Sequence, residues 1–132
     1  MLYFAYGSNL NRLQMMQRCP RSQPRFRAVL PGYKLIFTGW SRQWRGATAS
    51  IKPFQGEKVS GAVYEVPDED LPRLDRAEGY PAIHDRLTVR VIDEDGATHR
   101  AITYIKRDQS PGAPSREYMT LIRQGYRDWE IE

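Results

Sequence analysis

Short apolar runs recur along the whole chain and are separated by Gly, Pro and small polar residues. Runs of this length with alternating apolar and polar positions predict strands, and the alternation is clearest over residues 59–66. Pro and Gly between the runs predict turns, because proline lacks a backbone donor and glycine adopts conformations that other residues avoid. The expected strands cover residues 2–6, 25–30, 33–37, 47–52, 59–66, 86–92 and 101–105.

Three short segments have helical rather than strand-like spacing of their apolar residues. The first starts at an Asn cap, at position 9 or 11, and runs to about Arg18. Pro20 prevents it from continuing. Its expected buried face consists of Leu10, Leu13 and Met16.

The second helix has clear signals at both ends. Asp68 is the expected cap, and acidic residues fill the first turn, where the helix dipole favours them. Leu71 and Leu74 form its expected buried stripe. Gly79 ends it, and Pro81 prevents the helix from resuming.

The third helix is expected to start at the cap residue Ser115 and to be interrupted or ended by Gly125. Strands dominate the pattern, and they mostly follow one another without a regular helical crossover. We therefore expect an α+β fold on a mostly antiparallel or mixed sheet, which can close into a small barrel. A chain of 132 residues fits a single domain over residues 1–132.

The composition is that of a folded, soluble protein. Apolar residues make up 40% of the chain and charged residues 27%, which argues against a disordered segment. No apolar run approaches the roughly 18–20 residues that span a membrane, and no basic stretch precedes the first run as in a signal peptide. The single cysteine, Cys19, excludes an internal disulfide and fits a reducing compartment, so we expect a cytoplasmic protein without a membrane partner.

The net charge of +4 raises the alternative of a nucleic-acid binder. The arginines are scattered, however, and acidic residues lie among them, as over residues 73–78. The chain has no basic block and no RNA-binding signature. We therefore prefer a mixed, solvated surface and expect no nucleic-acid partner, although the positive charge favours small anionic ligands.

Several common kinds of site find no support in the sequence. His84 and His99 are far apart and no cysteine pair exists, so no metal site is expected. The glycine-rich motifs of the common nucleotide-binding loops are absent, so no nucleotide cofactor is expected. Cys19 has no histidine near it in sequence, which favours a buried or incidental thiol over a nucleophile.

A first candidate site lies where the first strand ends, at Tyr6, Gly7, Ser8 and Asn9. A strand exit followed by a helix start leaves backbone N–H groups without partners, and the helix dipole adds partial positive charge there. Gly7 lets the backbone approach a ligand without a Cβ in the way. The segment is either a capped turn or a binding loop for a carboxylate or a developing oxyanion.

A second candidate is Glu78, at the end of the second expected helix. The negative end of the helix dipole disfavours a carboxylate there and favours its protonated form. Such a group can both accept and donate a proton near neutral pH. The alternative is a solvated surface glutamate. Asp75, on the same segment, is expected to cap the helix or to pair with Arg73 or Arg76.

Three motifs occur together and in order: Tyr-Gly-Ser-Asn-Leu at residues 6–10, Leu-Asp-x-x-Glu-Gly at 74–79, and Pro-Ser-x-x-Tyr at 114–118. In this combination the chain resembles the gamma-glutamylcyclotransferase-like family, which includes the plant AIG2-like proteins and the gamma-glutamylamine cyclotransferases. The resemblance extends from Leu2 to about Trp129, and the pairing of the first two motifs is its most specific part.

The resemblance implies a small mixed β-barrel flanked by short helices, and an enzyme that needs no metal or organic cofactor. In the family's reaction, the α-amine of a γ-glutamyl group attacks its own γ-carbonyl, giving 5-oxoproline and a free amine or amino acid. Glu78 matches the catalytic carboxylate. The expected partner is a small γ-glutamyl substrate, and the expected state is a monomer or weak homodimer. The residues that match substrate contacts are Tyr6, Gly7, Ser8, Asn9, Leu10 and Tyr118.

One departure from the family pattern follows the Glu-Gly motif. Related sequences often carry Tyr-x-Arg there, whereas this chain has His84, Asp85 and Arg86. If position 84 shapes the cavity, the tail of the substrate differs. The Trp- and Arg-rich loop at residues 40–45 either shapes the mouth of the cavity or packs its rings on the barrel. The alternative function is a binding module that has the same cavity but no turnover.

Overall fold

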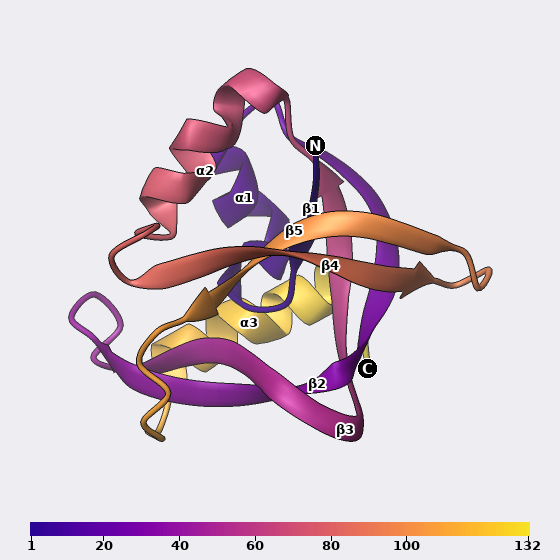
Figure 1. Cartoon of the computed structure of the whole chain (residues 1–132). Coiled ribbons are helices and arrows are strands. Elements are labelled where there is room, and N and C mark those ends of the chain that lie inside the picture. The colour runs from indigo at the N-terminus through magenta and orange to yellow at the C-terminus, as the bar shows by residue number, and fades with distance from the viewer.

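The computed structural model describes residues 1–132 as a closed five-stranded barrel with three α-helices outside it (Figure 1). The strands are β1 (Leu2–Ala5), β2 (Gln23–Ser41), β3 (Gly46–Glu65), β4 (His84–Asp93) and β5 (Thr98–Lys106). The helices are α1 (Arg12–Arg18), α2 (Leu71–Ala77) and α3 (Arg116–Asp128), with the short 3₁₀ helices η1 (Ser8–Leu10) and η2 (Asp68–Asp70). None of the helices combines the length and the apolar character that spanning a membrane requires.

The strand order around the barrel is β1-β3-β2-β4-β5. β1 pairs antiparallel with β3 and parallel with β5, and the other pairs are antiparallel. The hairpin of β4 and β5 forms where it was predicted. The prediction of a mixed, mostly antiparallel sheet that closes into a small barrel is therefore confirmed.

Two pairs of expected strands are in fact single long strands. The expected strands 25–30 and 33–37 are both part of β2, and 47–52 and 59–66 belong almost entirely to β3. The pairing shifts register where the expected breaks lie, because Pro31 pairs with Lys58 whereas Tyr33 pairs with Pro53. The prolines and Gly32, whose φ is +81°, bend the strands at this irregularity instead of ending them.

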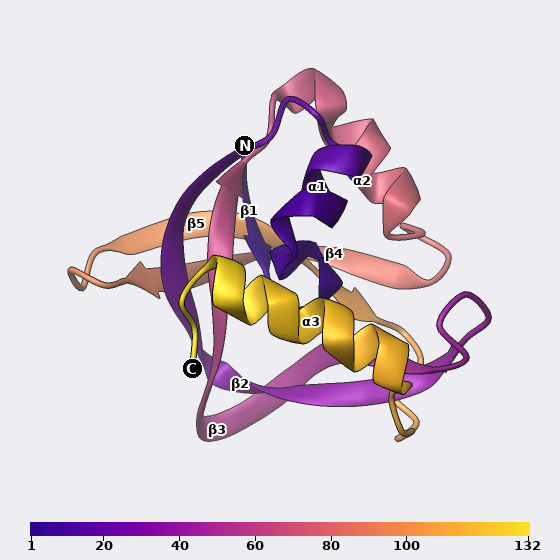
Figure 2. The ribbon, with the colours of Figure 1, turned by 180° about the vertical axis from the view of Figure 1, so that it is seen from behind.

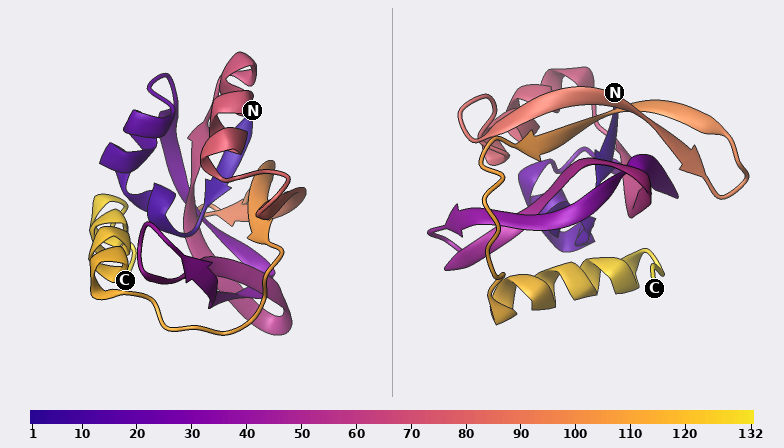
Figure 3. Two further views of the ribbon diagram at one scale, coloured as in Figure 1. Left: turned by 90° about the vertical axis from the view of Figure 1, so that its left-hand side faces the viewer. Right: turned by 60° about the horizontal axis from the view of Figure 1, so that its bottom comes forward.

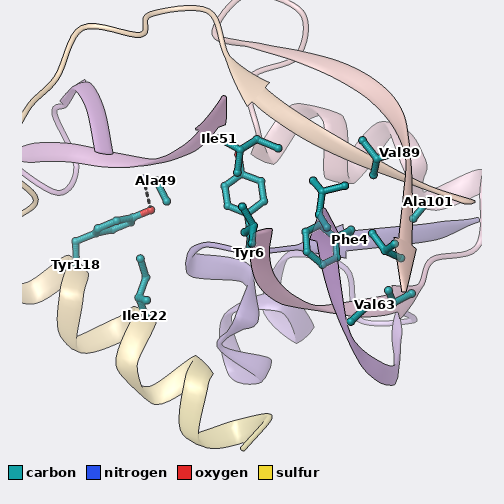
Figure 4. Close-up of a cluster of buried hydrophobic side chains, with 13 residues drawn as sticks. Phe4, Tyr6, Ala49, Ile51, Val63, Val89, Ala101, Tyr118 and Ile122 are labelled. Atoms are coloured by element: carbon teal, nitrogen blue, oxygen red, sulfur yellow. Dashed lines mark hydrogen bonds between the residues drawn. The ribbon is translucent and has the colours of Figure 1, made fainter. Parts of the chain in front are cut away.

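The barrel has one hydrophobic core inside and a second between its outer surface and the helices. Strand β1 contributes side chains to both cores, because alternate residues of a strand face opposite sides. Phe4 belongs to the inner cluster of buried side chains and Tyr3 to the outer cluster. Tyr118 and Ile122 point from α3 into the inner cluster, toward Tyr6 (Figure 4). Seen from behind, α3 crosses the barrel below α1 and α2 (Figure 2).

Helix α1 begins as predicted but buries a different face. The side chain of Asn11 caps it by accepting a hydrogen bond from the N–H of Gln14 (3.1 Å). Leu13 and Met16, which were expected inside, are 68% and 60% exposed, whereas Met15 is fully buried. The prediction is wrong because the helix turns Gln14 toward Ser8 and Asn9, and these polar contacts set its rotation.

Helix α2 is shorter than predicted at its start. Asp68 does not cap it but lies in η2, where its carboxylate accepts a hydrogen bond from the N-terminal ammonium of Met1 (3.2 Å). The helix starts at Leu71, which is partly buried, and Leu74 is fully buried as predicted. Gly79 follows the helix with a φ of +65°, so the predicted glycine stop is confirmed.

Helix α3 is longer than predicted. Ser115 caps it as expected, since its hydroxyl oxygen accepts a hydrogen bond from the N–H of Tyr118 (3.2 Å). Gly125 does not interrupt it. Instead, Gly125 lies where α3 crosses η1, and a Cβ there would be 2.6 Å from the backbone N of Asn11 and 2.7 Å from Cβ of Leu10. Close packing between helices therefore requires this glycine.

The substitution Gly125→Ala should lower the free energy of unfolding by about 1–3 kcal/mol, the usual cost of overpacking. Helix propensity alone would make the alanine variant more stable by about 1 kcal/mol. A lower free energy of unfolding would therefore be due to the steric contact. Denaturant unfolding measures the change. Arg123→Ala, exposed on the same helix, is the control and should change stability by less than about 0.5 kcal/mol. Unchanged or higher stability of Gly125→Ala would contradict the close packing.

Candidate active site

A cavity of about 570 Å³ opens between the barrel and the surrounding loops. Its lining brings together residues that are far apart in the sequence. They come from the segment after β1, from the end of α2 and from α3, and include Tyr6, Gly7, Ser8, Asn9, Glu78 and Tyr118. Both candidate sites of the sequence thus face one space.

Glu78 follows the last residue of α2, and its side chain is 17% exposed. Its Oε1 accepts hydrogen bonds from Nδ2 of Asn9 (2.8 Å) and from the hydroxyl of Tyr3 (3.3 Å). The amide of Asn9 is fixed in turn, because its Oδ1 accepts from Nη1 of Arg18 (2.9 Å) and from Nε2 of Gln14 (3.1 Å). The carboxylate therefore has a defined position, because hydrogen bonds from the protein hold its Oε1 atom.

Tyr3 is a site residue that the sequence did not reveal. Burial, reinforced by the neighbouring Glu78 carboxylate, raises the pKa of Tyr3 well above its ordinary value, so the hydroxyl stays protonated and can donate to Glu78. It also accepts a hydrogen bond from Nδ2 of Asn9 (3.0 Å). The only signal in the sequence is that a buried tyrosine hydroxyl usually needs a polar partner.

His84 lies beside Glu78 at the start of β4. Its Nδ1 is 2.5 Å from the carbonyl oxygen of Glu78, which can only accept, so the proton is assigned to Nδ1. Nε2 is then a free acceptor, 3.9 Å from Oε2 of Glu78. Burial lowers the pKa of His84, although the Glu78 carboxylate acts in the opposite direction. The ring is therefore neutral at neutral pH.

The lowered pKa of His84 makes stability depend on pH. The unfolded chain, with a His pKa of about 6.5, binds this proton more readily than the folded chain. The contribution to stability is thus fully present above about pH 6.5 and is lost as the pH falls from there through the lowered folded pKa. We expect the free energy of unfolding to fall more between pH 7 and 5 in the wild type than in His84→Asn. Equal losses in the two proteins would contradict the burial of a neutral ring.

The segment after β1 supplies backbone donors to the cavity. The N–H of Gly7 donates to no protein acceptor, and η1 starts at Ser8, so its first N–H groups have no acceptor within the helix. A Cβ on Gly7 would lie 3.1 Å from Cβ of Ala49 and 3.6 Å from the hydroxyl of Tyr118. The glycine backbone is therefore packed closely against the cavity wall.

The two tyrosines of the predicted site differ in what they offer a ligand. The hydroxyl of Tyr6 donates to the carbonyl of Tyr104 (2.6 Å), so its proton is already used. The hydroxyl of Tyr118 accepts a hydrogen bond from the N–H of Ala49 (2.9 Å; dashed in Figure 4), so its own proton remains available. Burial raises the pKa of Tyr118, which keeps that proton in place.

Two predicted residues are placed differently from the expectation. Leu10 is fully buried in the outer core and does not line the cavity; its carbonyl accepts from Nε1 of Trp129 (3.0 Å). Asp75 does not pair with a neighbouring arginine of α2. Its carboxylate accepts from Nη1 of Arg86 and from the hydroxyl of Tyr104, both at 2.5 Å, because β4 and β5 pass beside the helix.

The Trp-rich segment at residues 40–44 lines the cavity. Strand β2 continues to Ser41, so the turn between β2 and β3 is shorter than the expected loop. The ring of Trp44 packs on Tyr118, with 5.5 Å between centroids. After β5 the chain runs round the outside to α3 (Figure 3), and the N–H of Gly112 bonds to the carbonyl of Phe37 on the way. Both segments enclose the cavity on this side.

The fold and the cavity define a class, a small β-barrel enzyme in which a shielded carboxylate faces a donor-rich glycine loop. The family model described as gamma-glutamyl cyclotransferase, AIG2-like, matches residues 3–130. The chain therefore belongs to this family, and it is an enzyme of the gamma-glutamylcyclotransferase type.

Individual relatives agree with this assignment. The chain is 30% identical to a human gamma-glutamylcyclotransferase, over 96% of this chain and 70% of that protein, and 28% identical to the one from mouse, with the same coverage. A solved gamma-glutamyl cyclotransferase structure superposes with a TM-score of 0.96 at 28% identity, over 99% of this chain and 80% of that chain. A mouse AIG2-like protein, at 22% identity and a TM-score of 0.66 over 89% of this chain and 81% of that one, shares the fold.

Proposed function

We propose that the protein cyclises the γ-glutamyl group of a small γ-glutamyl amine or peptide to 5-oxoproline and releases the amine, with Glu78 as general acid and base. One observation carries the proposal: the Glu78 carboxylate and the backbone of Gly7, Ser8 and Asn9 line one cavity. The membership of the family supports the reaction type.

Proton transfer is the part of the reaction that needs Glu78. The α-ammonium of the substrate gives a proton to the carboxylate, and the resulting amine attacks the γ-carbonyl carbon of the same glutamyl group. A C–N bond forms, and the γ-carbonyl becomes an oxyanion. Glu78 then passes its proton to the leaving nitrogen, the original amide C–N bond breaks, and the carbonyl re-forms. The new ring nitrogen gives its surplus proton to the released amine, which leaves as an ammonium ion. The carboxylate ends as it began, and one group serves both steps.

The free backbone donor of Gly7 and the available hydroxyl proton of Tyr118 suit an oxyanion or the glutamyl α-carboxylate. Donors fixed by the fold need no reorganisation when negative charge develops, which is why such groups contribute strongly to catalysis. Because nucleophile and electrophile belong to one chain, holding the substrate in its folded conformation supplies much of the remaining rate enhancement.

Two acceptors suit the substrate ammonium before it loses its proton. They are the carboxylate of Glu78 and the neutral Nε2 of His84, which lie 3.9 Å apart. Tyr3 and Asn9 hold only one edge of the carboxylate, through Oε1. Oε2 thus remains for the proton transfer.

Incubation of the protein with a panel of γ-glutamyl amines and γ-glutamyl peptides, followed by assay of 5-oxoproline, tests the proposal. We expect 5-oxoproline and the free amine in equal amounts. Thermal stabilisation by panel members without any 5-oxoproline would instead establish the alternative, a binding module that has the cavity but no turnover. No product and no stabilisation with any member would exclude both for this substrate class.

A further inference from the structure

The cavity holds a second proton acceptor beside the Glu78 carboxylate. The Nδ1–H of His84 donates to the carbonyl oxygen of Glu78 (2.5 Å), which leaves Nε2 with a lone pair and no hydrogen-bond partner in the protein. Oγ1 of Thr38 is the one buried side-chain polar atom that lacks a partner. Nε2 of His84, which also lacks one, is therefore not sealed inside the protein but open to the cavity that His84 lines.

The proposed reaction moves two protons from one nitrogen to another. The α-nitrogen of the substrate starts as an ammonium with three protons and ends in the ring with one, while the released amine leaves as an ammonium. In the tetrahedral intermediate both nitrogens are bonded to the same carbon, so a direct transfer between them would pass through a strained four-membered ring. Two acceptors that reach different nitrogens avoid this ring.

Glu78 and His84 have the separation that such a pair requires. Oε2 of Glu78 and Nε2 of His84 lie 3.9 Å apart, so each can take a hydrogen bond of about 2.9 Å from a different nitrogen of the same intermediate. Once Glu78 has accepted the first proton, it holds that proton until the leaving nitrogen takes it. Nε2 is then the free acceptor beside the surplus proton of the attacking nitrogen.

The groups around His84 make an imidazolium there short-lived. Burial lowers the pKa of His84, and the charges of Lys106 from β5 and Arg18 from α1 lower it further, whereas Glu78 acts in the opposite direction. Tyr104 packs edge-on against the ring, with 6.3 Å between centroids, and burial raises its pKa, so it stays uncharged. The ring thus takes a proton from a strong acid, such as the nitrogen of a forming amide, and releases it readily to an amine.

We infer that His84 is a second proton-transferring residue of the reaction, with Nε2 as the acceptor of the surplus proton on the attacking nitrogen. The inference rests on the proposed cyclotransferase function. The N–H bond of the new ring nitrogen breaks, its electron pair stays on that nitrogen, and the lone pair of Nε2 forms the new N–H bond. Nε2 then gives the proton to the released amine, and the imidazole returns to its neutral form.

The first test removes Nε2 and keeps the contact made by Nδ1. In His84→Asn the side-chain amide can still donate to the carbonyl of Glu78, but it cannot take up a proton. We expect kcat for 5-oxoproline formation to fall by about 10²-fold, the lower end of the usual contribution of an acid–base group, with KM little changed. The matched control is His99→Asn, at the other histidine of the chain, which pairs with Asp93 (2.7 Å) away from the cavity. It should behave as the wild type.

Two further measurements separate proton transfer from a structural role. Imidazole added to His84→Ala should restore part of kcat, in proportion to its unprotonated fraction, because the free base can occupy the space of the ring. In the wild type, kcat/KM reports the titrating groups of the free enzyme, so its acid limb should include the midpoint of the His84 titration measured by NMR. That component should be missing in His84→Asn.

The opposite results overturn the inference. Full kcat in His84→Asn would exclude the role, and so would a loss that leaves the acid limb unchanged and that imidazole does not relieve in His84→Ala; the ring would then only hold the backbone of Glu78. A wild-type acid limb without the His84 midpoint would exclude it even if neither variant folded. Absence of 5-oxoproline from the wild type with every γ-glutamyl substrate would instead remove the proposed function itself.

Discussion

Glu78→Gln should reduce kcat for 5-oxoproline formation by about 10²- to 10⁴-fold, the usual contribution of a general acid and base. The amide has nearly the same shape as the carboxylate, and its oxygen can still accept the hydrogen bonds from Asn9 and Tyr3. It cannot, however, take a proton from the substrate ammonium. We therefore expect a loss of turnover with the folded structure retained, measured by product assay and thermal unfolding.

Two further variants define the cause of that loss. Glu78→Asp keeps the acid but shortens the side chain by one methylene, which moves it away from Nδ2 of Asn9 (2.8 Å in the native protein). Part of the activity should remain. Glu69→Gln removes an exposed carboxylate that pairs with Arg21 (3.3 Å) and should leave activity unchanged. Full turnover in Glu78→Gln would exclude the assigned mechanism.

Local signals predicted most elements of the fold but not how the barrel closes. The β4–β5 hairpin, the caps Asn11 and Ser115, and the stop at Gly79 all depend on neighbouring residues. Closure depends on the parallel pairing of β1 with β5, at Tyr3 and Ile102. These two residues are so far apart in the sequence that the apolar pattern of a short segment cannot predict their pairing.

Errors in the prediction arose where packing or polar contacts outweigh the preference that the apolar pattern indicates. Leu13 and Met16 were expected inside because they are apolar, yet both are exposed. Gly125 was expected to break α3, yet it is required by contact with η1. The partner of Gly125 is distant in sequence, and the rotation of α1 depends on hydrogen bonds of Gln14 that the spacing of apolar residues does not predict.

The candidate site, like the fold, was predicted only in part. Glu78 and the loop after β1 were predicted because their motifs are local, and the cavity places them together. Tyr3 was not predicted, because it lies in a strand whose pattern indicates only burial. Its polar contacts arise from the position of β1, which brings its hydroxyl beside Asn9 and Glu78.

Gly7→Val should abolish detectable 5-oxoproline formation while the fold survives. A Cβ at this position would lie 3.1 Å from Cβ of Ala49 and 3.6 Å from the hydroxyl of Tyr118, and the two methyl groups of valine extend further into the cavity wall. They would occupy the space beside the free N–H of Gly7, where we propose that the substrate contacts the backbone. The measurements are kcat/KM and the thermal unfolding midpoint; full activity would exclude the loop from substrate binding.

A double substitution separates contact with substrate from crowding of the wall. Gly7→Ala introduces the 3.1 Å contact with Ala49, and Ala49→Gly removes the atom that is met. In the double variant the strain is relieved, but the added methyl group still lies beside the backbone donor. We expect stability to recover and activity to stay low, with Ala49→Gly alone as the reference. Recovery of activity together with stability would show that Gly7 is needed only for packing, and that the substrate does not approach its backbone.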